Sequence, residues 1–174
     1  MRVLLDEETI LAGVASMSAE IRDCYGDTPV TIIGVLTGSV VLLADLIRKL
    51  DMPLRVGVIQ TSSYEGTSRG KLRVNSELML DIRDRHVLIV DDIFDTGHTL
   101  TEVVSLLGKL QPASVRSAVL LKKTGRKEVD MDPDFAAFDI PDEFVVGYGL
   151  DYNDAYRDLP FVAVLESKDL AEHG

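Results

Sequence analysis

Cysteine and basic charge are both scarce in this 174-residue sequence. The single cysteine, Cys24, excludes an internal disulfide and a zinc cluster built from cysteines. Eighteen Lys and Arg residues against 29 Asp and Glu residues give a net charge of −11 at pH 7. Such an acidic chain is a poor candidate for holding nucleic acid through its overall field. A phosphorylated metabolite is still an acceptable ligand where local groups or metal ions neutralise its charge.

Long hydrophobic runs are absent as well. No apolar run approaches the roughly 18 residues of a membrane-spanning helix, and the N-terminus lacks the charged-then-apolar layout of a signal peptide. We therefore expect a cytoplasmic protein that does not insert into a membrane. The length, together with 46% hydrophobic residues, predicts one domain over 1–174 with a sizeable core and excludes wholesale disorder.

Helical and strand-like patterns alternate along the chain. Apolar residues recur from Ile10 to Ile21 at helical spacing, with Asp6 as the expected N-cap. Further helices are expected at 40–50 and 99–110. Short apolar runs predict strands at 30–36, 54–60, 86–92, 115–121, 144–149 and 161–165. The polar segment 61–70 is expected to be a mobile loop, with a flap strand at 72–80, and 124–142 has weak periodicity.

This alternation predicts the α/β class, with a mostly parallel sheet covered by helices on both faces. In such folds ligands bind beyond the carboxyl ends of the strands. One expected strand end carries two adjacent carboxylates, Asp91 and Asp92. Strand alternation sends neighbouring side chains to opposite faces, but where the strand ends the backbone turns, and both can reach one crevice.

A small-residue turn follows this acidic pair and leads into a helix. Backbone N–H groups at a helix N-terminus bind anions, so the turn predicts a phosphate cradle. Thr96 and Thr99 add hydroxyl donors, and Gly97 allows close approach of the backbone. Asp95 stands between the acidic pair and the cradle. A plain N-capped helix would explain one Asp or Thr, but not the whole arrangement.

Residues 87–100 (VLIVDDIFDTGHTL) resemble the phosphoribosyl-diphosphate (PRPP) motif of type I phosphoribosyltransferases. The segments 36–39 (LTGS), 63–64 (SY), 121–124 (LKKT) and 141–160 (PDEFVVGYGLDYNDAYRDLP) narrow the resemblance to the hypoxanthine–guanine phosphoribosyltransferases. It runs from about Val30 to Glu166.

This resemblance implies a purine-salvage enzyme that transfers the phosphoribosyl group of PRPP to N9 of hypoxanthine or guanine, giving IMP or GMP and diphosphate. It implies the type I fold, a small hood formed from the N- and C-terminal segments, a flexible catalytic loop, Mg²⁺ as cofactor, and a homodimer or homotetramer. No nucleic acid partner is expected.

In the family, the residues matching Asp91 and Asp92 hydrogen-bond the ribose hydroxyls of PRPP. The residue matching Asp95 is the general base near purine N7. The 5-phosphate is wrapped by the residues that match Asp95, Thr96, Gly97, His98 and Thr99; His98 receives no catalytic role.

The resemblance also assigns the purine and diphosphate contacts. Lys122 is expected to donate to O6 of the base, with Lys123 beside it in solvent. Phe144 would stack on the purine and the Val145 backbone would read its edge. The remaining assignments are Asp151 as the direct Mg²⁺ ligand and Arg157 as a diphosphate contact.

Two further segments complete the expected site. Thr37 and Gly38 match a diphosphate-binding turn that in the family contains a cis peptide and usually carries Lys where this chain has Thr37. The side-chain contribution of that Lys is therefore missing, while backbone donors are retained. Ser63 and Tyr64 match the flexible loop that closes over PRPP and excludes water.

Three alternatives remain open from the sequence. A xanthine-preferring enzyme would use the same residues. A PRPP-sensing RNA-binding regulator would share the 87–100 motif, but the acidic charge argues against it. A phospho-acceptor receiver domain also pairs acidic residues on an α/β sheet, although its pair belongs near the start of the chain.

Overall fold

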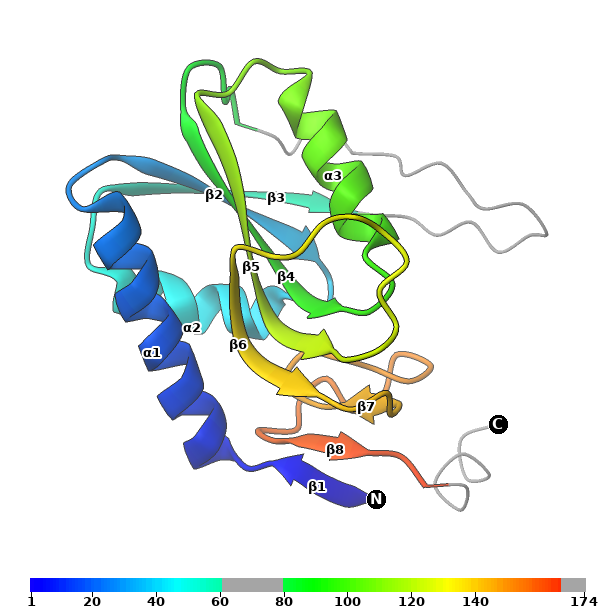
Figure 1. Cartoon of the computed structure of the whole chain (residues 1–174). Coiled ribbons are helices and arrows are strands. Elements are labelled where there is room, and N and C mark those ends of the chain that lie inside the picture. The colour runs from blue at the N-terminus through cyan, green and yellow to red at the C-terminus, as the bar shows by residue number, and fades with distance from the viewer. Residues whose placement is uncertain (61–79, 167–174) are drawn as a thin grey trace.

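The computed structural model describes residues 1–60 and 80–166. Its largest feature is a sheet of five parallel strands in the order β3-β2-β4-β5-β6 (Figure 1). The strands are β2 (Val30–Leu36), β3 (Leu54–Gln60), β4 (His86–Phe94), β5 (Ser114–Lys123) and β6 (Phe135–Ile140). The sheet and the helices flanking it confirm the predicted α/β class.

Helices cover both faces of this sheet. α1 (Glu7–Tyr25) and α2 (Val40–Leu50) pack on one face, and α3 (His98–Gly108) packs on the other. The strands divide accordingly: Leu88 and Val90 of β4 join the core under α1 and α2, while Val87 and Ile89 join the core under α3. This division follows from the two-residue period of a strand buried on both sides.

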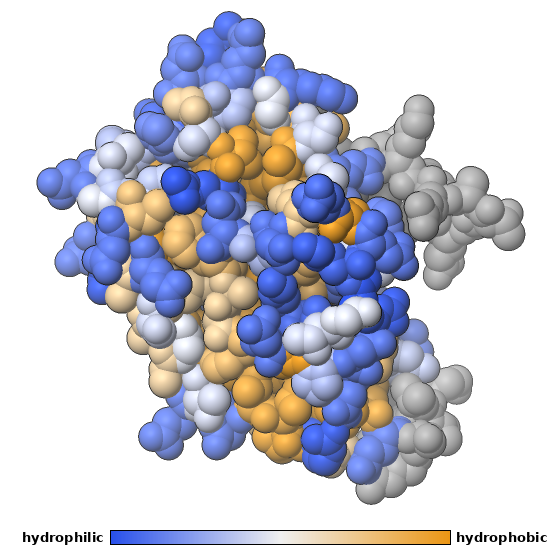
Figure 2. Space-filling view, in the orientation of Figure 1, coloured by the Kyte–Doolittle hydropathy of each residue, from blue (hydrophilic) through white to orange (hydrophobic). Residues whose placement is uncertain are grey.

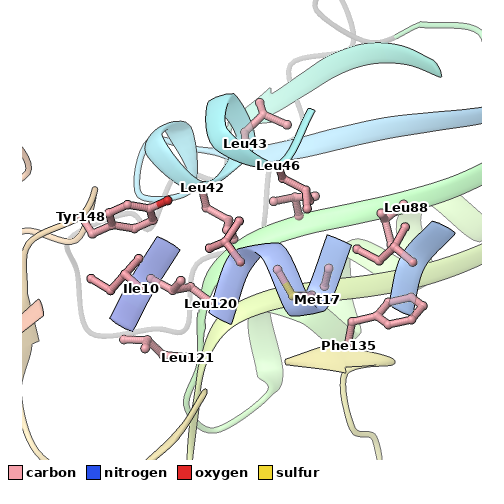
Figure 3. Close-up of a cluster of buried hydrophobic side chains, with 14 of the residues drawn as sticks. Ile10, Met17, Leu42, Leu43, Leu46, Leu88, Leu120, Leu121, Phe135 and Tyr148 are labelled. Carbon is pink, nitrogen blue, oxygen red and sulfur yellow. The ribbon is translucent and has the colours of Figure 1, made fainter. Parts of the chain in front are cut away.

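The first helix follows the sequence pattern. Asp6 caps α1 by accepting a hydrogen bond from the Thr9 N–H (2.8 Å), and this bond lowers the pKa of the Asp6 carboxyl. Figure 3 shows side chains of α1 and α2, including Ile10, Met17 and Leu42, gathered against the strands of the large sheet. The predicted N-cap and the predicted apolar face are both confirmed.

A second, antiparallel sheet brings distant parts of the chain together. It has the order β1-β8-β7, from β1 (Arg2–Leu5), β8 (Val162–Val164) and β7 (Val145–Val146). The terminal ammonium of Met1 lies 2.9 Å from the Glu166 carboxylate. In Figure 2 an apolar patch is visible over this small sheet, at the bottom of the view.

Some elements differ from the prediction. β1 and β6 have no counterpart in the sequence reading, because a four-residue strand and a strand of mixed burial give little periodicity. The strand expected at 144–149 is confined to Val145–Val146. Gly147, Tyr148 and Gly149 have φ angles of 97°, 51° and 100°, which end the extended backbone.

Ser63, Tyr64 and nearly all of the expected flap strand lie outside the described residues. Among the residues that the structure does describe, no helix has the length and apolar character needed to cross a membrane.

Candidate active site

The candidate site lies at the carboxyl edge of the large sheet. A pocket of about 310 Å³ is lined there by residues from the end of β2, the end of β4, the start of α3 and the loop after β7. This edge is where the fold class binds ligands. The lining residues include Thr37, Gly38, Asp91, Asp92, Asp95, Thr96, Gly97, Thr99, Asp151 and Arg157.

Asp91 and Asp92 both line this pocket, although they are neighbours on one strand. Asp91 is 7% exposed. Burial raises its pKa well above the ordinary range, and the adjacent Asp92 charge adds to the effect. Burial raises the pKa of Asp92 as well. The pair therefore holds charge that its surroundings oppose, as expected of a site built to contact polar ligand groups.

The turn after β2 packs tightly against the acidic pair. The Leu36–Thr37 peptide bond is cis, and Ser39 Oγ donates to the Val35 carbonyl (2.6 Å). A Cβ atom on Gly38 would lie 1.6 Å from Asp92 Oδ2. Only glycine lets the backbone pass this close to the carboxylate.

The loop after β7 lies directly on the same turn. A Cβ atom on Gly149 would lie 2.2 Å from the Gly38 carbonyl oxygen. This close packing brings two charged side chains of the loop to the pocket. Arg157 contacts Asp151 (Nη2 to Oδ1, 2.9 Å) and donates to the Gly149 carbonyl (2.8 Å). Asp151 Oδ2 also accepts the Asp154 N–H (2.9 Å).

The start of α3 faces the pocket as a cradle of small residues. Thr96, Gly97 and Thr99 line the pocket, and Gly97 precedes the helix with a φ angle of 90°. The His98 side chain takes another direction and lies 2.7 Å from the Glu128 carboxylate. A helix N-terminus with exposed N–H groups attracts an anion, and threonine hydroxyls add donors.

A second pocket of about 250 Å³ adjoins the first. Its lining residues are Asp92, Ile93, Asp95, Lys123, Phe144, Val145, Leu150 and Asp151. The two pockets share Asp92, Ile93, Asp95 and Asp151. Phe144 is 52% exposed and meets Tyr152 edge to face, with ring centroids 5.7 Å apart. An exposed aromatic ring on a pocket is suited to stacking on a flat ligand.

Lys122 does not lie where the sequence reading expects it. Its Nζ contacts Asp132 (2.8 Å), and hydrogen bonding to that carboxylate raises the pKa of Lys122. Lys123, expected in solvent, instead lines the second pocket with a side chain only 9% exposed and Nζ 3.5 Å from Asp95 Oδ2. Because β5 extends through Lys123, consecutive side chains point to opposite faces, and only the second lysine turns toward the pocket.

Two further charged residues next to the site are absent from the sequence reading. Arg126 Nε lies 3.0 Å from Asp95 Oδ1, and Arg126 Nη1 lies 3.5 Å from Asp142 Oδ1. Both residues fall in the charge-rich stretch 124–142, where no periodic pattern points to a site. Asp142 also lies in the 141–160 segment that carries the family resemblance, but the sequence assigns it no role.

Known proteins resemble this chain over almost its whole length. The family model of the phosphoribosyl transferase domain matches residues 3–153. The hypoxanthine-guanine phosphoribosyltransferase of Staphylococcus epidermidis is 40% identical over 168 residues, covering 95% of this chain and 94% of that protein. The hypoxanthine phosphoribosyltransferase of Salmonella typhimurium is 41% identical over 166 residues, covering 93% of each.

The solved structures agree with these relatives. A hypoxanthine phosphoribosyltransferase variant from Trypanosoma cruzi, complexed with the product IMP, superposes with a TM-score of 0.91 at 37% identity, covering 99% of this chain and 93% of that one. Another structure of the same enzyme addresses the role of its C-terminal region in oligomeric state and activity. By fold, site geometry and sequence, the chain belongs to the phosphoribosyltransferase family and, within it, to the hypoxanthine-guanine phosphoribosyltransferases.

Proposed function

We propose that this chain transfers the phosphoribosyl group of PRPP to N9 of hypoxanthine or guanine, with Asp95 as general base. The observation that carries the proposal is the pair of adjoining pockets that share Asp95 and Asp151. One pocket is rich in donors for phosphate and the other has an aromatic ring and a buried ammonium. A reaction between a phosphorylated sugar and a flat base needs these two environments in contact.

The first pocket suits PRPP. The 5-phosphate lies at the start of α3, on the backbone N–H groups of Asp95 to Thr99, where the helix dipole favours an anion. The acidic pair accepts hydrogen bonds from the ribose hydroxyls. The diphosphate lies toward the backbone donors of Thr37 and Gly38 and toward Arg157. In this chain Thr37 replaces the usual Lys, so Arg157 supplies the cationic contact from the described residues of that pocket.

The second pocket suits a 6-oxopurine. Phe144 stacks on the ring and the Val145 backbone reads its edge. Lys123, in place of Lys122, donates to O6, because its ammonium lies at this pocket and has three donors but no acceptor. Adenine would present an amino group to that ammonium, donor against donor, and leave a buried charge without its partner.

Asp95 connects the two half-sites. Displacement of diphosphate from the anomeric carbon passes through an oxocarbenium-like state, as in glycoside cleavage. Removing the purine proton as the new bond forms keeps the attacking nitrogen electron-rich, which is general-base catalysis. Asp95 borders both pockets, so its carboxylate reaches a base in the second while PRPP fills the first.

The residues of the first pocket fit a Mg²⁺ ion held mainly by substrate. Magnesium is usually bound through one or two carboxylates together with substrate phosphates and water. Asp151 lines both pockets and would supply the carboxylate. When bound, the ion neutralises charge on the diphosphate leaving group. The described residues contain no group of three or more His, Cys, Asp or Glu side chains arranged for a metal.

Two parts of the family resemblance remain proposals for this chain. The first is the role of Ser63 and Tyr64, which lie outside the described residues, in excluding water from PRPP. The second is the active assembly, a homodimer or homotetramer.

Steady-state kinetics with PRPP, Mg²⁺ and each of hypoxanthine, guanine, xanthine and adenine test the proposal. We expect kcat/KM for hypoxanthine or guanine to exceed that for adenine by about 10²-fold or more. Preference for xanthine over both would instead indicate the xanthine-preferring alternative. A kcat/KM for adenine comparable to that for hypoxanthine would contradict a hydrogen bond from a lysine to O6.

The lysine assignment has a matched pair of variants. Lys123→Gln should reduce the ratio of kcat/KM for hypoxanthine to kcat/KM for adenine, because an amide can both donate and accept. The lost hydrogen bond to a charged group costs about 1.5–3 kcal/mol. Lys122→Gln is the control and should leave this ratio unchanged. The reverse result would restore Lys122 as the O6 donor.

A further inference from the structure

Four charged side chains form a closed ring beside the second pocket. Lys123 Nζ lies 3.5 Å from both Asp95 Oδ2 and Asp142 Oδ1. Arg126 contacts the same two carboxylates, with Nε 3.0 Å from Asp95 Oδ1 and Nη1 3.5 Å from Asp142 Oδ1. Each cation therefore has two carboxylate neighbours, and each carboxylate has two cations.

The members of this ring come from separate parts of the fold. Asp95 lies between β4 and α3, Lys123 ends β5, Arg126 follows β5, and Asp142 follows β6. Asp95 and Lys123 line the second pocket, whereas Asp142 and Arg126 do not. Asp142 can thus influence a ligand in this pocket only through the residues that it holds.

Burial makes the ring important for Lys123. Its side chain is 9% exposed, while that of Asp142 is 48% exposed. A buried ammonium needs a counter-charge nearby, because water no longer stabilises it. The contact with Asp95 is the one that a purine would disturb, since Asp95 then turns to the purine proton and Lys123 to O6. After that exchange, Asp142 is the carboxylate still in contact with Lys123.

We propose that Asp142 is a positioning residue, the shared counter-ion that holds the Lys123 ammonium in place and aimed at the base when a 6-oxopurine replaces its contact with Asp95. This inference rests on the proposed function. Arg126 has a complementary role. It pairs with Asp95 before the base binds and stays paired with Asp142 afterwards. Specificity for the 6-oxo group thus depends on a carboxylate that touches no substrate.

The test compares Asp142→Asn with Asp132→Asn. Asp132 makes ion pairs with Lys122 and Lys127, and none of these three residues lines the second pocket. The control therefore removes the same charge without removing a contact to Lys123. Loss of a half-exposed counter-ion should raise KM for hypoxanthine about 3- to 10-fold. KM for PRPP should stay within about twofold, and Asp142→Glu should restore most of the hypoxanthine KM. Asp132→Asn should change neither constant.

A double variant separates positioning from a general loss of structure. If Asp142 acts through Lys123, adding Asp142→Asn to Lys123→Gln should raise the hypoxanthine KM no further, because the group it positions is already gone. Additive effects, an equal rise in KM for PRPP, or no effect of Asp142→Asn would overturn the inference. The proposed hydrogen bond from Lys123 to O6 has its own test. It is contradicted if Lys123→Gln alone leaves the hypoxanthine KM and the selectivity against adenine unchanged.

Discussion

Asp91 is a carboxylate held where burial opposes its charge. Its pKa is raised well above the ordinary value, first by burial and then by the neighbouring Asp92 charge. A carboxyl whose pKa is higher in the folded state binds more protons folded than unfolded. Stability therefore falls as pH rises from the unfolded-state pKa through the raised folded-state pKa. In the proposed function this carboxylate accepts hydrogen bonds from the ribose hydroxyls, a role that comes at the expense of stability.

Asp91→Asn should therefore stabilise the ligand-free protein at neutral pH. Asparagine can still accept the Asp92 N–H, which now lies 2.9 Å from Asp91 Oδ1. The melting temperature should rise by a few degrees near pH 7.5, since about 1 kcal/mol corresponds to about 2–4 °C in a domain of this size. The gain should shrink toward pH 4, and PRPP should bind more weakly. Thermal unfolding at several pH values measures this trend, with the exposed Asp27→Asn as control. A variant less stable than the parent at every pH would refute the argument.

Asp151 is expected to matter through the metal and the diphosphate rather than through the purine. Calorimetry should show that chelation of Mg²⁺ by EDTA weakens PRPP binding to the unaltered chain. Asp151→Ala should lower PRPP affinity in Mg²⁺ by about 10- to 100-fold, since even residues that only support metal ligands contribute that much. Affinity for the purine should change much less. Equal PRPP affinity with and without the ion would show that Mg²⁺ takes no part in PRPP binding.

At the scale of elements, three short segments line the first pocket, which we propose binds the phosphates of PRPP. The turn at 36–38 follows β2, the loop 147–157 follows β7, and the cradle opens α3. Gly38 and Gly149 let the first two segments touch. The strength of this architecture lies in backbone proximity, which a side chain at either glycine would disrupt.

Gly38→Ala should impair PRPP binding by displacing the Asp92 carboxylate, because the added Cβ would lie 1.6 Å from Asp92 Oδ2. Overpacking of this kind typically costs about 1–3 kcal/mol, so we expect PRPP affinity to fall about tenfold with reduced stability. Gly108→Ala, at the end of α3 with nothing within 4 Å of the new Cβ, is the matched control. Calorimetry and thermal unfolding of both variants check the contrast. Unchanged PRPP affinity in Gly38→Ala would show that the contact is unimportant.

Regular elements could be predicted where burial imposes a period. The α1 residues repeat at helical spacing, and both that helix and the strand expected from the continuous apolar run of β2 appear in the structure. β6 could not be predicted, since it lies at the edge of the sheet with mixed burial. Lys122 is assigned from the resemblance alone, with the strand expected to end at residue 121. In the structure β5 runs through Lys123, so the two lysines point to opposite faces and only one of them can reach the pocket.

At the scale of the whole molecule, the site assembles from segments distant in sequence. The turn after β2, the end of β4, the end of β5 and the segment around β7 meet at one sheet edge. The sequence predicts that edge from strand–helix alternation, but not the ring of Asp95, Lys123, Asp142 and Arg126. Those ion pairs join residues that no local pattern connects. Only the folded sheet places them in contact.

In the proposed reaction Asp95 is the general base that links a PRPP pocket to a purine pocket. The most direct measurement is the turnover rate of Asp95→Asn at saturating PRPP, Mg²⁺ and hypoxanthine, alongside PRPP affinity of the same protein by calorimetry. We expect turnover to fall about 10²- to 10⁴-fold while PRPP affinity stays close to that of the unaltered chain. Near-normal turnover in the folded variant would contradict the role of Asp95 as general base.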